Sequence, residues 1–114
     1  MTAPSGEVFA INLFSMLPGV DAGEFERFST TVDRPTCLAH ADVVLGFDAF
    51  RVSAAPDGAP ADILEVMHVA DWHRWEQIRD NDPSMEPVME GFHKLVDPAT
   101  VRTYFTRPIL GDPQ

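Results

Sequence analysis

The chain has only one cysteine and few positive charges. Cys37 has no partner for an internal disulfide, and a thiol nucleophile needs a neighbouring base, so a buried apolar role is expected for it. Eight lysines and arginines against eighteen aspartates and glutamates give a formal net charge of −10. This charge repels phosphate backbones and anionic lipid surfaces, so we predict no nucleic-acid partner.

Long apolar runs are also missing. No run approaches the roughly 20 residues of a membrane-spanning helix, and the opening MTAPSGEV lacks the basic and apolar regions of a signal peptide. We therefore expect a cytoplasmic protein with no membrane partner. The 114 residues, 45% of them hydrophobic, are enough for one domain (1–114) with a modest core.

The four histidines lack the spacing of a metal site. His40, His68, His73 and His93 make no HExxH motif, no pairing with cysteine and no familiar set of two histidines and a carboxylate. We therefore predict a protein that binds no metal. His73 falls in the first turn of a predicted helix, where we expect it to face solvent.

Four β-strands are predicted from runs rich in β-branched and aromatic residues that are bounded by proline, glycine and aspartate. They cover residues 8–16, 43–53, 61–70 and 101–110. The turn PDGAP allows the second and third strands to form an antiparallel hairpin.

Apolar residues recur at helical spacing in the two longer intervals between these strands, which follow the first and the third strand. Asp21, followed three residues later by Glu24, resembles a capping box and begins a helix that runs to about residue 32, with Pro35 ending or kinking it. Asp71 can cap a second helix, and a third helical run follows the segment DNDPS. Its apolar stripe consists of Met85, Val88, Met89, Phe92 and Val96.

The order β-α-β-β-α-β predicts the ferredoxin-like split βαβ fold. This α+β fold has a four-stranded antiparallel sheet with helices on one face. The third strand is apolar on both sides, with Met67 and Val69 on one face and Leu64 and Val66 on the other. Because the helices can cover only one face, the other packs most simply against a second copy, so we predict a homodimer.

Four segments resemble the RedY-like (HapK-type) proteins of the dimeric α+β barrel superfamily. They are INLFSMLPGVDAGEFERF, TTVDRPTCLA, DILEVMHVAD and DPSMEPVMEGF. The resemblance implies a role in bacterial natural-product pathways, such as those that make prodiginines and tryptophan-derived bisindoles. It also implies a pocket between the sheet and the helices of each subunit, with the opposite sheet faces forming a dimer barrel.

The wider superfamily includes cofactor-independent monooxygenases, polyketide cyclases, haem-degrading enzymes and muconolactone isomerases. Monooxygenase-like members carry an asparagine on the first strand, and Asn12 is similar to it in its placement before the turn glycine Gly19. They often carry a pocket tryptophan two residues before the helix cap, where this chain has Val69. That departure disfavours oxygenase chemistry.

Glu65 is the most informative candidate residue. A carboxyl group within an apolar strand must be hydrogen-bonded, paired or neutralised, and burial raises its pKa toward the range useful for proton transfer. A salt bridge with Arg51 on the neighbouring strand is the alternative role. His68 lies on the opposite strand face, so both side chains enter one pocket only if the strand bulges.

Which face of the third strand lines the pocket depends on the landmark from which its residues are counted, and two landmarks give opposite answers. Counting back from the helix cap Asp71 directs Val69 and Glu65 into the pocket and His68 toward the dimer barrel. Counting forward from the start of the strand directs Asp62 and His68 into the pocket instead. We favour the first count because the helix cap is the firmer landmark.

These considerations give two sets of candidate site residues. The acid or base candidates are Glu65, His40, His68 and His93, and the substrate-binding candidates are Asn12, Phe50, Trp72 and Trp75. Most aromatic side chains fill cores, but eight phenylalanines, two tryptophans and one tyrosine are enough to line a cavity for a flat ligand as well.

The resulting hypothesis is an enzyme without a metal or organic cofactor. It would act by proton transfer on a reactive aromatic small molecule, derived from indole or pyrrole, and direct its cyclisation, isomerisation or deamination. One alternative is a cofactor-independent monooxygenase. The other is a binding protein that shields an unstable intermediate without chemistry.

Overall fold

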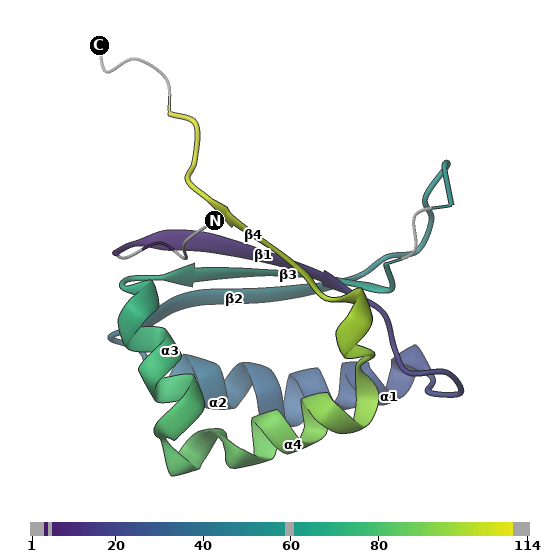
Figure 1. Ribbon diagram of the computed structural model, residues 1–114, viewed down its shortest axis with the longest axis horizontal. Coiled ribbons are helices and arrows are strands. Elements are labelled where there is room, and N and C mark those ends of the chain that lie inside the picture. Colours follow the sequence, from purple (N-terminus) through teal and green to yellow (C-terminus); the bar gives the residue numbers. More distant parts are fainter. Residues whose placement is uncertain (1–3, 5, 59–60, 111–114) are drawn as a thin grey trace.

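The computed structural model describes residues 4, 6–58 and 61–110, and shows a four-stranded sheet with helices on one face (Figure 1). The strands are β1 (Val8–Phe14), β2 (Val44–Arg51), β3 (Ile63–Val69) and β4 (Arg102–Thr106). They lie in the order β2-β3-β1-β4, and all neighbours are antiparallel. The predicted ferredoxin-like α+β fold is therefore confirmed. None of the described helices has the length and apolar character needed to cross a membrane.

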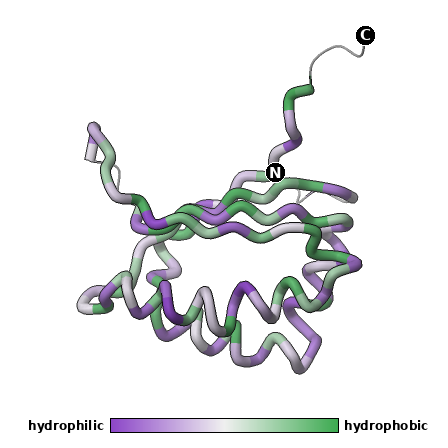
Figure 2. The backbone as a smooth tube through the Cα atoms, turned by 180° about the vertical axis from the view of Figure 1, so that it is seen from behind, coloured by the Kyte–Doolittle hydropathy of each residue, from purple (hydrophilic) through white to green (hydrophobic). Residues whose placement is uncertain are grey.

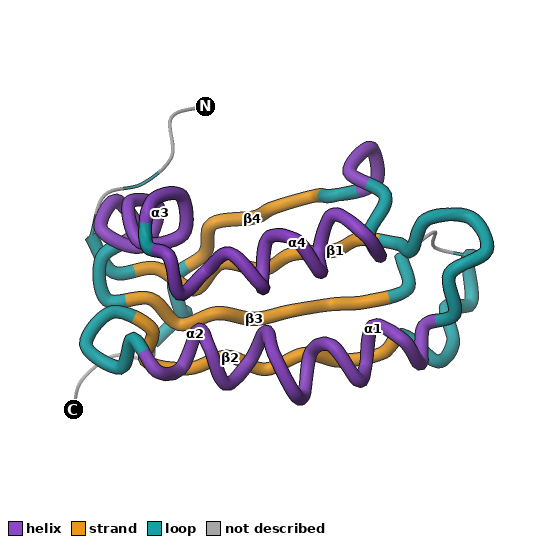
Figure 3. Tube along the Cα trace, turned by 90° about the horizontal axis from the view of Figure 1, so that it is seen from below, coloured by secondary structure: helices purple, strands orange, loops and turns teal. Residues whose placement is uncertain are grey.

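The helices form two long segments beneath the sheet. The first consists of α1 (Ala22–Phe28), the π-helical turn η1 (Ser29–Asp33) and α2 (Arg34–Ala39). The second consists of α3 (Trp72–Asn81), the 3₁₀ turn η2 (Pro83–Met85) and α4 (Glu86–Leu95), followed by the short η3 (Pro98–Thr100). Figure 3 shows α1 and α2 as one rod beneath the β2 side of the sheet, with α4 beside it.

Pro35 does not end the first helical segment, which continues beyond the predicted residue 32. It lies in the first turn of α2, and the N–H of Arg34 bonds to the carbonyl of Ser29, five residues back. Proline has no N–H, and in an α-helix its ring would clash with the carbonyl four residues earlier, so the wider π turn removes the conflict. The turn ends at Asp33, which is buried.

The predicted helix caps are present, whereas the last strand is shorter than predicted. Asp21 Oδ1 accepts the N–H of Gly23 at 3.0 Å, and Asp71 Oδ1 accepts the N–H of Arg74 at 3.4 Å. The last strand was expected to reach residue 110 but ends at Thr106, since Pro108 has no N–H for the sheet. Figure 1 shows the chain beyond β4 leaving the sheet.

The sheet buries one face and leaves the other without a helix. On β3, the buried Ile63, Glu65, Met67 and Val69 alternate with the half-buried Leu64, Val66 and His68. This alternation agrees with counting from the helix cap. Figure 2 shows hydrophobic positions along the strands, although the outer face of the sheet carries no helix.

Gly91 allows α4 to approach the first helical segment closely. A Cβ atom added there would overlap the ring of Phe28 and lie only 2.6 Å from its Cδ1. We expect Gly91→Ala to lower the free energy of unfolding by about 1–3 kcal/mol, because the ring must move. Urea denaturation measures this change. Gly23→Ala is the control, since a Cβ there keeps 3.6 Å from Asp21 and should be neutral or stabilising; equal effects would contradict the prediction.

Candidate active site

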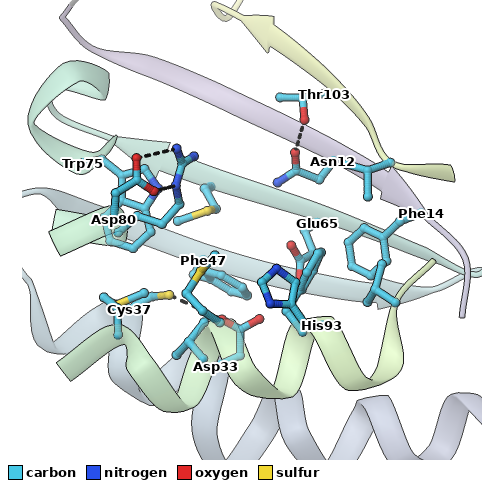
Figure 4. A pocket seen from close by; sticks show the side chains of 18 of the residues that line it. Asn12, Phe14, Asp33, Cys37, Phe47, Glu65, Trp75, Asp80, His93 and Thr103 are labelled. Carbon is cyan, nitrogen blue, oxygen red and sulfur yellow. Dashed lines mark hydrogen bonds and ion pairs between the residues drawn. The ribbon is translucent and has the colours of Figure 1, made fainter. Parts of the chain in front are cut away.

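A cavity of about 390 Å³ lies between the buried face of the sheet and the helices (Figure 4). Its size is typical of small-molecule sites. Its apolar wall includes Phe14, Phe47, Met67, Trp72, Trp75, Met85, Val88, Met89 and Phe92. Its polar lining comprises Asn12, Asp33, Cys37, Glu65, Arg79, Asp80, His93 and Thr103. The cavity therefore suits a largely apolar ligand that carries a few polar groups.

Glu65 projects from the middle of β3 into this cavity and is only 4% exposed. Burial is the main cause that raises its pKa to about 8, and the nearby charge of Asp33 raises it further. A hydrogen bond from Asn12 acts in the opposite direction. Within the described residues, Oε2 of Glu65 has no hydrogen-bond partner. This carboxyl group is thus suited to holding a proton near neutral pH.

Glu65 does not form the salt bridge with Arg51 that was the alternative role for its carboxyl group. Arg51 lies opposite Ile63 at the end of β2, and its guanidinium contacts Glu26 at 3.7 Å on the surface. The residue opposite Glu65 on β2 is Ala49. Glu65 therefore keeps a carboxyl group without a cationic partner among the described side chains.

Asn12 connects Glu65 to the outer strand β4. It lies opposite Glu65 in the β1–β3 pair and opposite Thr103 in the β1–β4 pair. The Thr103 hydroxyl donates to Asn12 Oδ1 at 2.8 Å, as Figure 4 shows. Because the amide oxygen is occupied, the amide NH₂ group is left to donate toward Glu65 or a ligand.

Asp33 is a second buried carboxyl group in the cavity, and it was not among the site residues predicted from the sequence. It is 5% exposed, and burial raises its pKa to about 6, while the thiol of Cys37 lowers it by donating to Oδ1 at 3.4 Å. The pKa of Cys37 is raised mainly by burial, and also by its hydrogen bond to Asp33 and the negative charges of Asp33 and Glu65. Cys37 therefore stays a neutral thiol. The four-residue spacing of Asp33 and Cys37 was a visible signal, but the π turn that orients them was not.

The histidine candidates divide between the cavity and the surface. His93 lines the cavity, and Figure 4 shows its ring extending from α4 toward the sheet. His40 lies outside the cavity wall, with Nε2 2.9 Å from the hydroxyl of Ser84. His68 lies on the open sheet face, where Nε2 is 2.7 Å from Glu7 Oε2. The structure thus brings His93, but neither His40 nor His68, into one cavity with Glu65.

Three of the four substrate-binding candidates line the cavity. Asn12, Trp72 and Trp75 do so, and within the described residues the buried Nε1 of Trp72 has no hydrogen-bond partner. Phe50 does not, because it pairs with Leu64 and lies on the open face of the sheet, where it is 55% exposed. Strand alternation separates it from the cavity. The prediction that Phe50 contacts a substrate in the cavity is therefore wrong.

The cavity lining includes the guanidinium of Arg79, from α3. Arg79 bonds to Asp80 Oδ1 at 2.9 Å and contacts Glu76 Oε2 at 3.8 Å, so its charge is compensated. In the described parts of the chain, no group of three or more histidine, cysteine, aspartate or glutamate side chains is arranged to hold a metal ion. Carboxyl groups of the lining can transfer protons, and its amide and hydroxyl groups can form hydrogen bonds.

A comparison with protein families gives a match over residues 8–109. The matching family is described as REDY-like protein HapK. No curated protein is significantly similar in sequence to the chain.

Solved structures with the same fold include HapK from Hahella chejuensis. The two chains are 20% identical, with 95% of this chain and 97% of that chain covered and a TM-score of 0.72. A dimeric protein of unknown function with a ferredoxin-like fold from Bacteroides fragilis is 13% identical, with 89% and 95% covered and a TM-score of 0.63. SnoaB, a cofactor-independent oxygenase from Streptomyces nogalater, is 15% identical, with 96% and 99% covered and a TM-score of 0.64. At these identities the likeness establishes the fold alone.

Proposed function

The chain belongs to the family of REDY-like proteins HapK, and on that premise we propose that it is a cofactor-independent enzyme of bacterial natural-product biosynthesis. It acts by proton transfer on a reactive aromatic intermediate. The observation that carries this proposal is the carboxyl group of Glu65, which is 4% exposed, has no ion-pair partner among the described residues and has a pKa raised to about 8. A general acid works best when its pKa lies near the working pH.

The cavity supports an aromatic substrate derived from indole or pyrrole. Phe14, Phe47, Trp75 and Phe92 offer flat apolar surfaces against which an aromatic ring packs. The amide of Asn12 and the carboxyl of Glu65 can orient a ring N–H or a carbonyl group. The proposed reaction is cyclisation, isomerisation or deamination, steered by a fixed proton donor.

The test is the product distribution of a reactive indole- or pyrrole-derived intermediate generated in the presence and absence of the purified protein. We expect the protein to change the ratio of products, because an acid at a fixed position favours one protonation site. A binding protein without chemistry would change the lifetime of the intermediate but leave the ratio as it is. That second result would contradict the proposal and favour the shielding alternative.

A cofactor-independent monooxygenase is the second candidate function. Asn12 lines the cavity from the first strand, the position where monooxygenase-like members of the superfamily carry an asparagine. Against it, the position expected for a pocket tryptophan is Val69, which is fully buried in the core. An oxygen electrode separates the two functions, since oxygenation consumes dioxygen in proportion to product and proton transfer consumes none.

We further propose that the protein is a homodimer formed through the open face of the sheet. That face carries the half-buried Ile11, Leu13, Leu64 and Val66 together with Phe50 and Tyr104, which are 55% and 53% exposed. An apolar sheet face of this kind commonly packs against another surface. The Bacteroides fragilis relative is described as dimeric.

We expect light scattering to give about twice the chain mass of 12.6 kDa. Phe50→Asp should shift the protein toward monomer, because it places a charge within the proposed interface. Ala54→Asp, at an exposed position after β2, is the control that should remain dimeric. A wild-type protein that is monomeric at micromolar concentration would contradict this proposal.

A further inference from the structure

Two buried carboxyl groups enter the cavity from opposite layers of the fold. Asp33 comes from the π turn and Glu65 from β3, and they are 5% and 4% exposed (Figure 4). None of the ion pairs formed between described residues includes either carboxyl group. Two uncompensated negative charges in one apolar cavity repel each other, and the charge of Asp33 does act on Glu65. The stable state is therefore one in which the two groups hold one proton.

The surroundings of the two carboxyl groups are unequal. Asp33 Oδ1 accepts the thiol of Cys37 at 3.4 Å, and this bond favours the ionised form of Asp33. Glu65 accepts a hydrogen bond from Asn12, but its Oε2 has no partner in the described part of the chain and can carry the proton. The shared proton is therefore better held on Glu65, while Asp33 stays ionised beside it.

The other titratable groups that line the cavity do not replace this pair. They are Cys37 from α2, Arg79 and Asp80 from α3, and His93 from α4. Cys37 is a hydrogen-bond donor to Asp33, while Arg79 and Asp80 bind each other at the other end of the cavity wall. His93 is an exposed side chain that contacts the cavity from α4.

We infer that Asp33 and Glu65 form an acid and base pair, with Asp33 as the proton acceptor and Glu65 as the proton donor. This inference deepens the proposed function and rests on it for the identity of the reaction. Asp33 takes a proton from one C–H or N–H bond of the substrate, and Glu65 gives its proton to another atom of the same conjugated system. The substrate gains and loses one proton, so the product is an isomer.

The pair ends such a cycle with Asp33 protonated and Glu65 ionised. Transfer of one proton from Asp33 to Glu65, directly or through a water molecule, restores the starting state. No oxidant, reductant or second substrate is required. Among the reactions open to the cavity, the pair therefore favours isomerisation of an aromatic or conjugated N–H compound over deamination.

The experiment is a pH titration of the free protein by NMR, with ¹³C in the side-chain carboxyl groups of aspartate and glutamate. The signals of Asp33 and Glu65 are assigned by their loss in Asp33→Asn and Glu65→Gln. We expect the midpoint of Glu65 to fall by about one pH unit in Asp33→Asn, because a neighbouring negative charge is removed. Asp57→Asn, in the exposed turn after β2, is the matched control and should leave that midpoint unchanged.

The coupling between two groups must be equal in both directions. This coupling appears in the midpoint of the group that ionises second. Asp33 titrates while Glu65 still holds its proton, so the midpoint of Asp33 should change little in Glu65→Gln. The order of the two midpoints in the wild type, Asp33 below Glu65, tests the pair if Asp33→Asn fails to fold. Cys37→Ala should raise the midpoint of Asp33, whereas Cys37→Ser should largely preserve it. A Glu65 midpoint that does not move in Asp33→Asn, or an Asp33 midpoint above that of Glu65 in the wild type, would overturn the inference. Since no substrate is used, this result is independent of the product-ratio test of the proposed function.

Discussion

Replacing Glu65 by glutamine is expected to reduce turnover by roughly 10²–10⁴-fold while leaving the fold and the proposed dimer intact. The factor is that of a lost general acid or base. Glutamine has nearly the same shape as glutamate, but its side chain cannot supply a proton at the rate of a carboxyl group. The measurement is the rate of product formation from the reactive aromatic intermediate, with circular dichroism to check the fold.

His68→Gln is the matched comparison, because His68 belongs to the same strand but lies on the open face, 2.7 Å from Glu7. We expect it to keep near-normal turnover and to weaken the dimer instead. Near-normal turnover in Glu65→Gln, combined with loss of turnover in an intact His68→Gln dimer, would place the active site on the other face of the sheet.

The folded protein is expected to lose stability as the pH rises from about 5 to 8. Burial raises the pKa of Glu65 from 4.5 to about 8 and that of Asp33 from 3.8 to about 6. Between these values the folded chain holds protons that the unfolded chain releases, so unfolding becomes more favourable with each step in pH. The shift of Glu65 corresponds to roughly 5 kcal/mol, a large part of the stability of a small domain.

The urea midpoint measured at pH 5 and pH 8 gives the size of this effect. Glu65→Gln should flatten the dependence, since glutamine does not titrate, and should unfold at a higher urea concentration than the wild type at pH 8. The pKa values of the exposed Asp80 and Asp82 are lowered by hydrogen bonds from Arg79 and Ser84, so these groups stay ionised throughout this window. A wild-type midpoint that is constant or rises between pH 5 and 8 would show that Glu65 is ionised in the folded protein.

The sheet and the face of Glu65 were predictable because their signals are local. Strand periodicity and the turn residues located all four strands, and the cap Asp71 fixed which residues of β3 face the helices. Asn12 was recognised as the polar residue of an apolar strand, and β1 does direct it into the cavity. These features depend on alternation within one strand, which a sequence displays directly.

Phe50 and Asp33 were harder to place because their positions depend on more distant contacts. The face of Phe50 follows from the pairing of β2 with β3, and this pairing passes through an irregularity between Val44 and Gly46. Asp33 lies just beyond residue 32, where the first helix was predicted to end. Its burial depends on a helical turn with an unusual hydrogen-bond pattern.

That π turn has a consequence for comparing sequences. A turn closed by a bond from the Arg34 N–H to the Ser29 carbonyl contains one residue more than an α-helical turn. A relative with a regular helix here will align correctly only if a one-residue gap is opened between positions 29 and 33. Without that gap, the residue matched to Asp33 will be its neighbour, and a shared carboxyl group will look like a substitution.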